Sequence, residues 1–362
     1  MLSCSFRSVR RAVSAAALTC GAVALLGASG ASAAGSKIFN VTNLVSDGST
    51  TAVVTDAALV NVWGLSASAT SPWWVANNGS SSSTLYNGAG TKSATVVSVA
   101  GGPTGTVANA NAADFVISNG TTSSNARFLF ATEAGTILGW APTVNATATV
   151  TGVDNSGAGA VYKGLATLND RLYATDFHNA RVDVFDSAFK PVTLANAFND
   201  PKIPKGWAPF GIQALSGNIF VTYAMQDAAK HDNVSGGGLG YVDEYSPDGV
   251  LIATVASKGK KNAPLNAPWG LAMAPASFGT FGGDLLVGNF GSGRVDAYQP
   301  ITATHFAYKG QLRVATGAPI TLDGLWAIAF GNDASAGPST SLFFASGPTG
   351  EKHGLFGSIA VG

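Results

Sequence analysis

The stretch 173-YATDFHNARVDVFD-186 contains two short apolar runs that flank the polar residues Asp176, His178, Asn179 and Arg181. Apolar runs on either side of a polar turn are typical of a β-hairpin. The same polar residues could instead form a catalytic cluster, because an acid, an imidazole and a cation lie within a few residues. Copies of the stretch elsewhere in the chain help to decide between these interpretations.

Five other segments share its first half, in which a short apolar run ends in a small polar turn. They are "WWVANN" (73–78), "LFATEA" (129–134), "IFVTYA" (219–224), "LLVGNF" (285–290) and "LFFASG" (342–347). An apolar run precedes each copy, a third follows it, and most copies have a fourth. The preceding runs align at Gly64, Phe115, Gly164, Gly211, Gly270 and Ala327, at intervals of 47 to 59 residues. Repeats of this length with three or four strands indicate the blades of a β-propeller.

The two ends of the chain complete this pattern. The sixth copy stops after its third strand, whereas "KIFNVTNLV" (37–45) belongs to no copy. Pairing these two segments would close the ring and cover strand edges that otherwise favour aggregation. The sequence therefore predicts an all-β fold, a six-bladed β-propeller with four-stranded blades, whose last blade is closed by the N-terminal strand. A β-helix needs shorter coils, and a β-sandwich does not explain six matching units.

Residues 1–33 have the features of a secretory signal peptide. Arg7, Arg10 and Arg11 precede an apolar run, and "ASA" (31–33) fits a cleavage site. Both cysteines, Cys4 and Cys20, fall in this segment, so the remaining chain would contain no disulfide. We expect a single propeller domain over residues 34–362 in a secreted or periplasmic protein.

The composition of residues 34–362 excludes several classes of partner. They contain 17 basic and 20 acidic residues, because the predicted signal peptide holds three arginines and no acid. No basic face is expected to attract nucleic acid. No later apolar run is long enough to span a bilayer. We expect a monomer that recognises a small molecule, a glycan or a protein.

The opening stretch resembles the NHL-repeat signature, in which a strand ends in Asp and an Asn and an Arg follow in the turn. The matching residues are Asp176, Asn179 and Arg181. The segment 34–362 as a whole resembles a group of exported bacterial propeller proteins related to NHL domains, whose activity is undefined. The resemblance implies the fold and specifies no reaction.

In a propeller, loops at one face of the ring surround the central channel and commonly bind ligands. Two sets of residues are predicted to lie there. One set follows the second strand of each blade and comprises Asn77, Glu133, Asp176, Tyr223, Asn289 and Ser346. The other begins each innermost strand at the channel mouth and comprises Trp63, Asp114, Lys163, Phe210, Trp269 and Trp326. We interpret this second set as ligand-binding. Its aromatic rings could stack on a sugar or apolar ligand, or could plug the channel.

A divalent cation is the first alternative to plain ligand binding. Lactonase-type six-bladed propellers hold such an ion with acids and amides near the channel mouth, and Asn77, Glu133, Asp176 and Asn289 could supply similar oxygens. Against this, Trp or Phe occupies four of the six positions at the predicted mouth. We therefore expect no cofactor, with a divalent cation as the alternative.

An acid–base or metal site is the second alternative. The candidate catalytic residues are Glu133, His178, His231 and His353, which fall on the same set of loops, in the manner of streptogramin-lyase-like propellers. No fixed spacing ties them together. The sequence thus favours a binding scaffold that recognises its ligand on the loop-rich channel face. A metal-assisted lyase or hydrolase at the channel mouth is the alternative, and whether the protein is an enzyme stays open.

Overall fold

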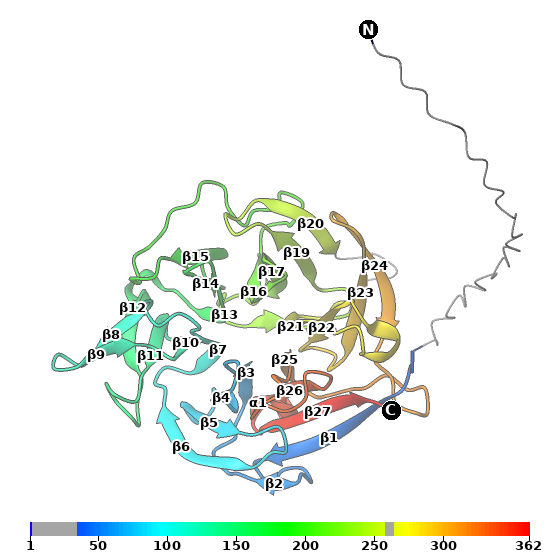
Figure 1. The fold of residues 1–362 in the computed structure, drawn as a ribbon, viewed down its shortest axis with the longest axis horizontal. Coiled ribbons are helices and arrows are strands. Elements are labelled where there is room, and N and C mark those ends of the chain that lie inside the picture. The colour runs from blue at the N-terminus through cyan, green and yellow to red at the C-terminus, as the bar shows by residue number, and fades with distance from the viewer. Residues whose placement is uncertain (2–34, 258–263) are drawn as a thin grey trace, which may run out of the picture. The chain divides into compact units, whose positions relative to one another are not determined.

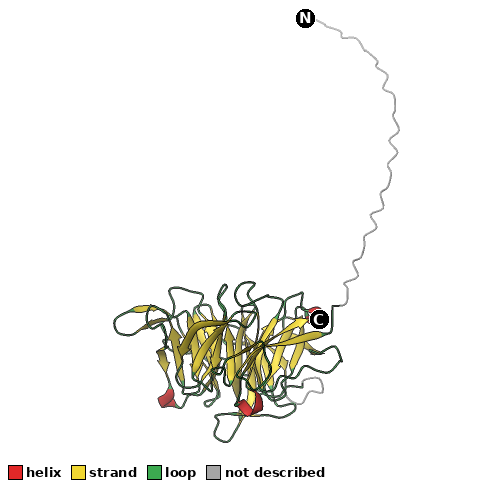
Figure 2. Ribbon diagram, turned by 90° about the horizontal axis from the view of Figure 1, so that it is seen from below, coloured by secondary structure: helices red, strands yellow, loops and turns green. Residues whose placement is uncertain are grey.

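The repeated strands form six small antiparallel sheets arranged in a ring around a channel (Figure 1). This computed structural model describes Met1 and residues 35–257 and 264–362, so the predicted signal peptide, apart from Met1, lies outside the described residues. The prediction of a six-bladed β-propeller is confirmed. The strands run between two faces that both carry loops (Figure 2).

Each blade begins with the strand that lines the channel and continues outward. The innermost strands are β3 (Val62–Ser66), β7 (Pro103–Ala108), β13 (Tyr162–Leu168), β16 (Trp207–Leu215), β21 (Pro268–Met273) and β25 (Leu325–Phe330). The second strands are β4 (Trp73–Asn77), β10 (Phe128–Thr132), β14 (Arg171–Asp176), β17 (Asn218–Gln226), β22 (Leu285–Asn289) and β26 (Leu342–Ser346). The third strands are β5 (Ser82–Tyr86), β11 (Thr136–Trp140), β15 (Arg181–Phe185), β19 (Tyr241–Tyr245), β23 (Val295–Thr302) and β27 (Leu355–Val361).

The ring closes in the sixth blade through strands from both ends of the chain. β1 (Phe39–Ser46) pairs antiparallel with β27, from Phe39 opposite Val361 to Ser46 opposite Leu355. Figure 1 shows the two strands side by side. The short β2 (Val54–Thr55) adds to the outer edge of β1. The predicted closure by the N-terminal strand is confirmed.

Blade three lacks the regular fourth strand that the other blades have. Outermost strands of four blades are β6 (Lys92–Ser98), β12 (Val150–Asp154), β20 (Leu251–Ala256) and β24 (His305–Gln311). In blade three, the run 190–198, predicted to be this strand, touches β15 only around Pro191 and Val192. Pro191 has no N–H to donate, and the chain then leaves the sheet. The prediction of a fourth strand in this blade is wrong.

Blade two begins earlier than the sequence predicts. Its innermost strand is β7, whereas the run at 114–118 contributes β8 (Val116–Ser118) to a separate hairpin with β9 (Ser123–Asn125). The position aligned with Gly64 is therefore Gly105, and not Phe115. The placement of Asp114 at the channel mouth is wrong, because Asp114 lies in the loop between β7 and β8.

Glycines allow the innermost strands to approach one another closely. A Cβ atom on Gly211 would overlap the backbone carbonyl of Trp269, and one on Gly270 would meet that of Trp326. Gly64, Gly105 and Gly164 have similar contacts with the neighbouring innermost strand. These contacts fix the residue that precedes each glycine at one end of the channel.

In the part of the chain that the structure describes, no helix has the length and apolar character needed to cross a membrane.

Candidate functional site

Aromatic rings close the channel at the end where the innermost strands begin. We call Trp63, Phe210, Trp269, Phe290 and Trp326 the aromatic plug. Trp63 and Trp326 stack with ring centroids 3.4 Å apart, and Trp269 meets both rings edge-on. Phe290 stacks on Trp326 at 4.1 Å, and Phe210 meets the same ring at 5.7 Å.

The rings of the plug cover one another. Trp63, Phe210 and Trp326 are each at most 2% exposed, and Trp269 is 8% exposed. Aromatic pairs of this kind contribute stability beyond their buried area. Of the two interpretations that the sequence left open, the geometry therefore favours plugging over stacking on a ligand.

Lys163 is the second residue of β13, the innermost strand of blade three, and is fully buried beside this plug. Its Nζ atom lies 4.9 Å from the centroid of the Trp63 ring. The ammonium forms ion pairs with Glu133 and, at 3.1 Å, with Asp232. His231 contacts the same Asp232 oxygen at 3.1 Å. We call these four residues (Glu133, Lys163, His231 and Asp232) the lysine cluster.

Polar residues from blades one and six extend this cluster. Asn78 donates a 2.8 Å hydrogen bond to Glu133 Oε2, and Asn61 donates to Asn78 and to Glu351. Burial raises the pKa of the Glu351 carboxyl, and the hydrogen bond from Asn61 and the charge of Lys163 offset this only in part. Burial also acts to raise the pKa of Asp232, but its interactions with Lys163 and His231 outweigh it and lower the pKa.

The lysine cluster brings together two of the four predicted catalytic residues. Glu133 and His231, with Asp232, place one potential ligand atom each within 4.8 Å of one another. Oxygen and imidazole ligands at such spacing suit a divalent cation. However, the Lys163 ammonium contacts both carboxylates, and a metal ion would have to displace this cation. These residues therefore fit a metal ion poorly while Lys163 holds its present position.

The other two predicted catalytic histidines have different partners. His353 Nδ1 lies 2.7 Å from Asp47 Oδ2. The His178 ring lies beside Gly159, and Gln226 donates to the His178 backbone carbonyl at 3.3 Å. Among the described side chains, neither histidine forms a hydrogen bond or ion pair with Glu133 or His231, so the predicted set of three histidines is not assembled as one site.

Three of the four candidate metal ligands, Asn77, Asp176 and Asn289, are held inside their own blades. Asp176 accepts hydrogen bonds from Asn179 and pairs with Arg181 at 3.3 Å. Asn77 donates to Ser82 and Thr84 of its own blade. The stretch that opened the sequence analysis is thus a hairpin turn held by Asp176.

Asn289 and Glu133 are the other two candidate metal ligands. Asn289 donates to Asp296 and accepts from the Asn266 N–H, both within blade five. The structural equivalent of Asp176 in blade two is Thr132. Each lies opposite the first residue of its blade's innermost strand, which is Tyr162 for Asp176 and Pro103 for Thr132. Glu133 comes one residue later, and this offset lets its carboxylate reach Lys163.

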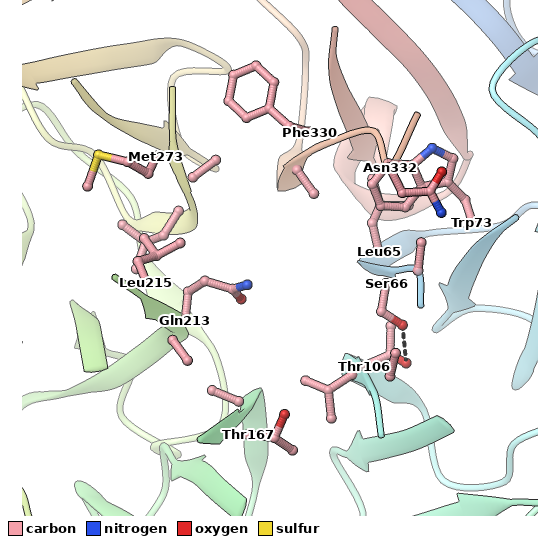
Figure 3. A pocket seen from close by; sticks show the side chains of 18 residues that line it. Leu65, Ser66, Trp73, Thr106, Thr167, Gln213, Leu215, Met273, Phe330 and Asn332 are labelled. Atoms are coloured by element: carbon pink, nitrogen blue, oxygen red, sulfur yellow. Dashed lines mark hydrogen bonds between the residues drawn. The ribbon is translucent and has the colours of Figure 1, made fainter. Parts of the chain in front are cut away.

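The opposite end of the channel is open. There the C-terminal halves of all six innermost strands line a cavity of about 390 Å³ (Figure 3). We call it the channel cavity. Its polar lining residues are Ser66, Thr106, Thr167, Gln213 and Asn332, and no charged residue contributes to the lining. Larger apolar side chains there include Leu65, Leu215, Leu271, Met273 and Phe330.

Sequence reasoning missed this cavity and also Asn61, Asn78, Asp232 and Glu351 near the lysine cluster. Most of the cavity residues follow the aligned glycines, or Ala327 in blade six, by one to four positions, so the alternation of the innermost strands carries a signal for them. Asn61, Asn78 and Asp232 lie on irregular loops, and Glu351 ends the four-residue helix α1 (Pro348–Glu351), so no comparable periodicity marks them.

The fold and the channel define a six-bladed propeller closed by aromatic rings at one end. No known family profile matches the chain. It is 30% identical over 304 residues to the uncharacterized protein R648 of Acanthamoeba polyphaga mimivirus, an alignment that covers 80% of this chain and 73% of that protein. The chain belongs to the same family as this protein. It is also 31% identical over 227 residues to protein R640 of the same virus, covering 62% of this chain and 41% of that protein.

Solved structures with the same fold are more distant in sequence. A protein of unknown function from Bacteroides thetaiotaomicron VPI-5482 superposes with a TM-score of 0.57 at 13% identity, over 89% of this chain and 76% of that one. A streptogramin B lyase superposes with a TM-score of 0.52 at 11% identity, over 90% and 97% of the two chains. At these identities the likeness concerns the fold alone.

Proposed function

We propose that this protein is a binding scaffold whose ligand occupies the channel cavity. The observation that carries the proposal is the asymmetry of the channel. One end is filled by the aromatic plug, while the other forms a cavity of about 390 Å³ to which every blade contributes. Pockets of 300–1,000 Å³ are typical of small-molecule sites.

The aromatic end supports ligand binding less well. The predicted contacts Trp63, Phe210, Trp269 and Trp326 are buried against one another, and Lys163 is buried beneath its acidic partners. A ligand would have to separate these side chains to reach them. For this reason we place the ligand site at the open end instead of on the loop-rich face.

A metal-assisted lyase or hydrolase is the second candidate. It is favoured by the convergence of Glu133, His231 and Asp232. Lys163 weighs against it, because its ammonium already forms ion pairs with both carboxylates. Secretion or periplasmic localisation is also a proposal, which rests on the sequence of residues 1–33.

The scaffold is tested by thermal unfolding with a panel of neutral and charged small molecules, because a ligand that binds only the folded state raises the melting temperature. Ala214 lines the cavity and is half-buried, so Ala214→Trp fills part of it. Ala188→Trp, in an exposed turn, is the matched control. A ligand that stabilises the wild type and the control but not Ala214→Trp supports the proposal. A panel without any such ligand contradicts it.

A further inference from the structure

The channel cavity also constrains the chemistry of what it binds. We infer that its ligand is an uncharged, hydroxyl-bearing molecule with an apolar part, of which an alkyl glycoside is a simple example. This inference rests on the proposed function, because it concerns the same cavity.

The residues that line the channel cavity disfavour a charged ligand. It contains no Asp, Glu, Lys, Arg or His, although such residues surround the aromatic end of the channel. A charged group that entered would lose hydration without an ionic partner, which is costly in a confined site. Neutral ligands do not incur this cost.

Free polar groups of the lining match hydroxyls. Gln213 is exposed where it lines the channel cavity, and neither its side chain nor the Thr167 hydroxyl forms a hydrogen bond with another described residue. An amide offers both donors and an acceptor, and a hydroxyl offers both roles. The hydroxyls of Ser66 and Thr106 share one hydrogen bond of 3.2 Å, so one of their two protons stays free to donate.

Asn332 is the exception in this set. Its amide donates to the carbonyls of Ser68 and Ser71, and its oxygen accepts from the N–H groups of Ala334 and Ala336. Asn332 therefore shapes the rim, and Gln213 is the larger free polar side chain of the lining.

Apolar and polar side chains both face the cavity. Figure 3 shows Met273, Leu215 and Gln213 on one side, with Leu65, Ser66 and Thr106 on the opposite side. Phe330 adds a half-buried ring to the apolar part. A molecule that carries both hydroxyls and hydrocarbon would satisfy both kinds of side chain, whereas a fully polar molecule would leave the apolar side chains without a partner.

Three probes with one hydrocarbon chain test the charge requirement: hexyl glucoside, hexyl glucuronide and hexyl glucosaminide, which are neutral, anionic and cationic at pH 7. Binding is measured by calorimetry on the full chain. We expect the neutral glycoside to bind at least about tenfold more tightly than either charged probe, and Ala214→Trp to abolish this binding. Equal or tighter binding of a charged probe, lost in Ala214→Trp, would overturn the ligand class and leave the scaffold standing. If instead Ala214→Trp binds the glucoside as the wild type does, the cavity is not the site and both proposals fail.

Variants of Gln213 provide an independent test of the inferred ligand class. Gln213→Leu should weaken hexyl glucoside binding about threefold to tenfold, as expected for the loss of one neutral hydrogen bond. Gln299→Leu, on an exposed position of β23, is the control and should bind as the wild type does. Gln213→Glu should shift the preference toward the glucosaminide. An unchanged preference in Gln213→Glu, with folding confirmed by circular dichroism, would contradict the inference.

Discussion

The indole rings of Trp63 and Trp326 stack with an interplanar angle of 17° across the junction between the first and the sixth blade. Trp63 is the second residue of β3, the innermost strand of blade one, and Trp326 is the second residue of β25, the innermost strand of blade six. The β1–β27 pairing closes the ring within blade six, and this stack joins blade six to blade one at the channel. The plug is therefore part of the closure of the ring.

Replacing Trp326 tests how much the aromatic plug contributes to the stability of the fold. Trp326 contacts Trp63, Phe210, Trp269 and Phe290, and large-to-small changes of a buried Trp cost about 3–5 kcal/mol. We expect Trp326→Ala to lower the free energy of unfolding by about that amount in urea titrations. Phe330→Ala, at the half-buried rim of the open end, should cost clearly less. Equal losses in the two variants would argue against a special role for the plug.

Lys163 is predicted to keep divalent cations away from Glu133, His231 and Asp232. Lys163→Met removes the competing ammonium and leaves two carboxylates beside an imidazole. We expect Mn²⁺ to raise the melting temperature of Lys163→Met and to leave that of the wild type unchanged. In the double variant Lys163→Met/Glu133→Gln, the effect of Mn²⁺ should disappear. Stabilisation of the wild type by Mn²⁺ would instead support the metal-assisted alternative.

The sequence was sufficient for the ring and its closure, because six matching units and an unmatched N-terminal strand determine the topology. It failed in blade two, where "DFVIS" (114–118) looks more like a strand than "PTGTVA" (103–108) does. The sequence nevertheless contained a signal for the correct innermost strand. Pro103-Thr104-Gly105 matches Pro209-Phe210-Gly211 and Pro268-Trp269-Gly270, and the glycine is required by the close approach of the strands.

The candidate site was predicted less completely than the fold. Glu133 and His231 meet because a one-residue offset in blade two and a long loop in blade four bring them to Lys163. Such convergence depends on loop conformation, which no periodicity in the sequence encodes. The channel cavity exists because aromatic rings fill only one end of the channel. The sequence alone left two alternatives for these rings, plugging the channel or stacking on a ligand.

Asp243 makes the stability of the protein depend on pH. It is fully buried in β19, and burial, with a contribution from the charge of Asp200, raises its pKa to about 7. Between pH 4 and 7 the unfolded chain therefore ionises this group while the folded chain keeps the proton. Stability contributed by the protonated form is fully present below pH 4 and is lost as the pH rises to about 7.

Asp243→Asn should remove this dependence. The variant keeps an oxygen that can accept from Tyr245, whose hydroxyl lies 3.2 Å from the carboxylate, and it cannot ionise. We expect its melting temperature to exceed that of the wild type at pH 8, and the difference to shrink toward pH 4. The gain in free energy of unfolding is at most about 4 kcal/mol for a shift of this size. Asp186→Asn, in a turn, is the control, and a gain that does not vary with pH would contradict the assignment.

The incomplete edge of blade three should be visible in hydrogen exchange. The Val184 carbonyl accepts from the Val192 N–H, so the backbone groups of Val184 point away from β14. Val182 lies two residues earlier, and its N–H must point the same way. Beyond it lies a hollow of about 530 Å³, in place of a fourth strand.

Val242 of blade four is the matched reference. It lies opposite Thr222 in β17, as Val182 lies opposite Thr175 in β14. Unlike Val182, it is covered on its outer side by the fourth strand, β20. We expect the Val182 amide to exchange more than about tenfold faster than the Val242 amide, since an exposed edge amide needs no sheet opening to exchange. The measurement is residue-resolved exchange by nuclear magnetic resonance. Equal protection of the two amides would mean that another segment pairs with β15 in solution, and blade three would then be complete.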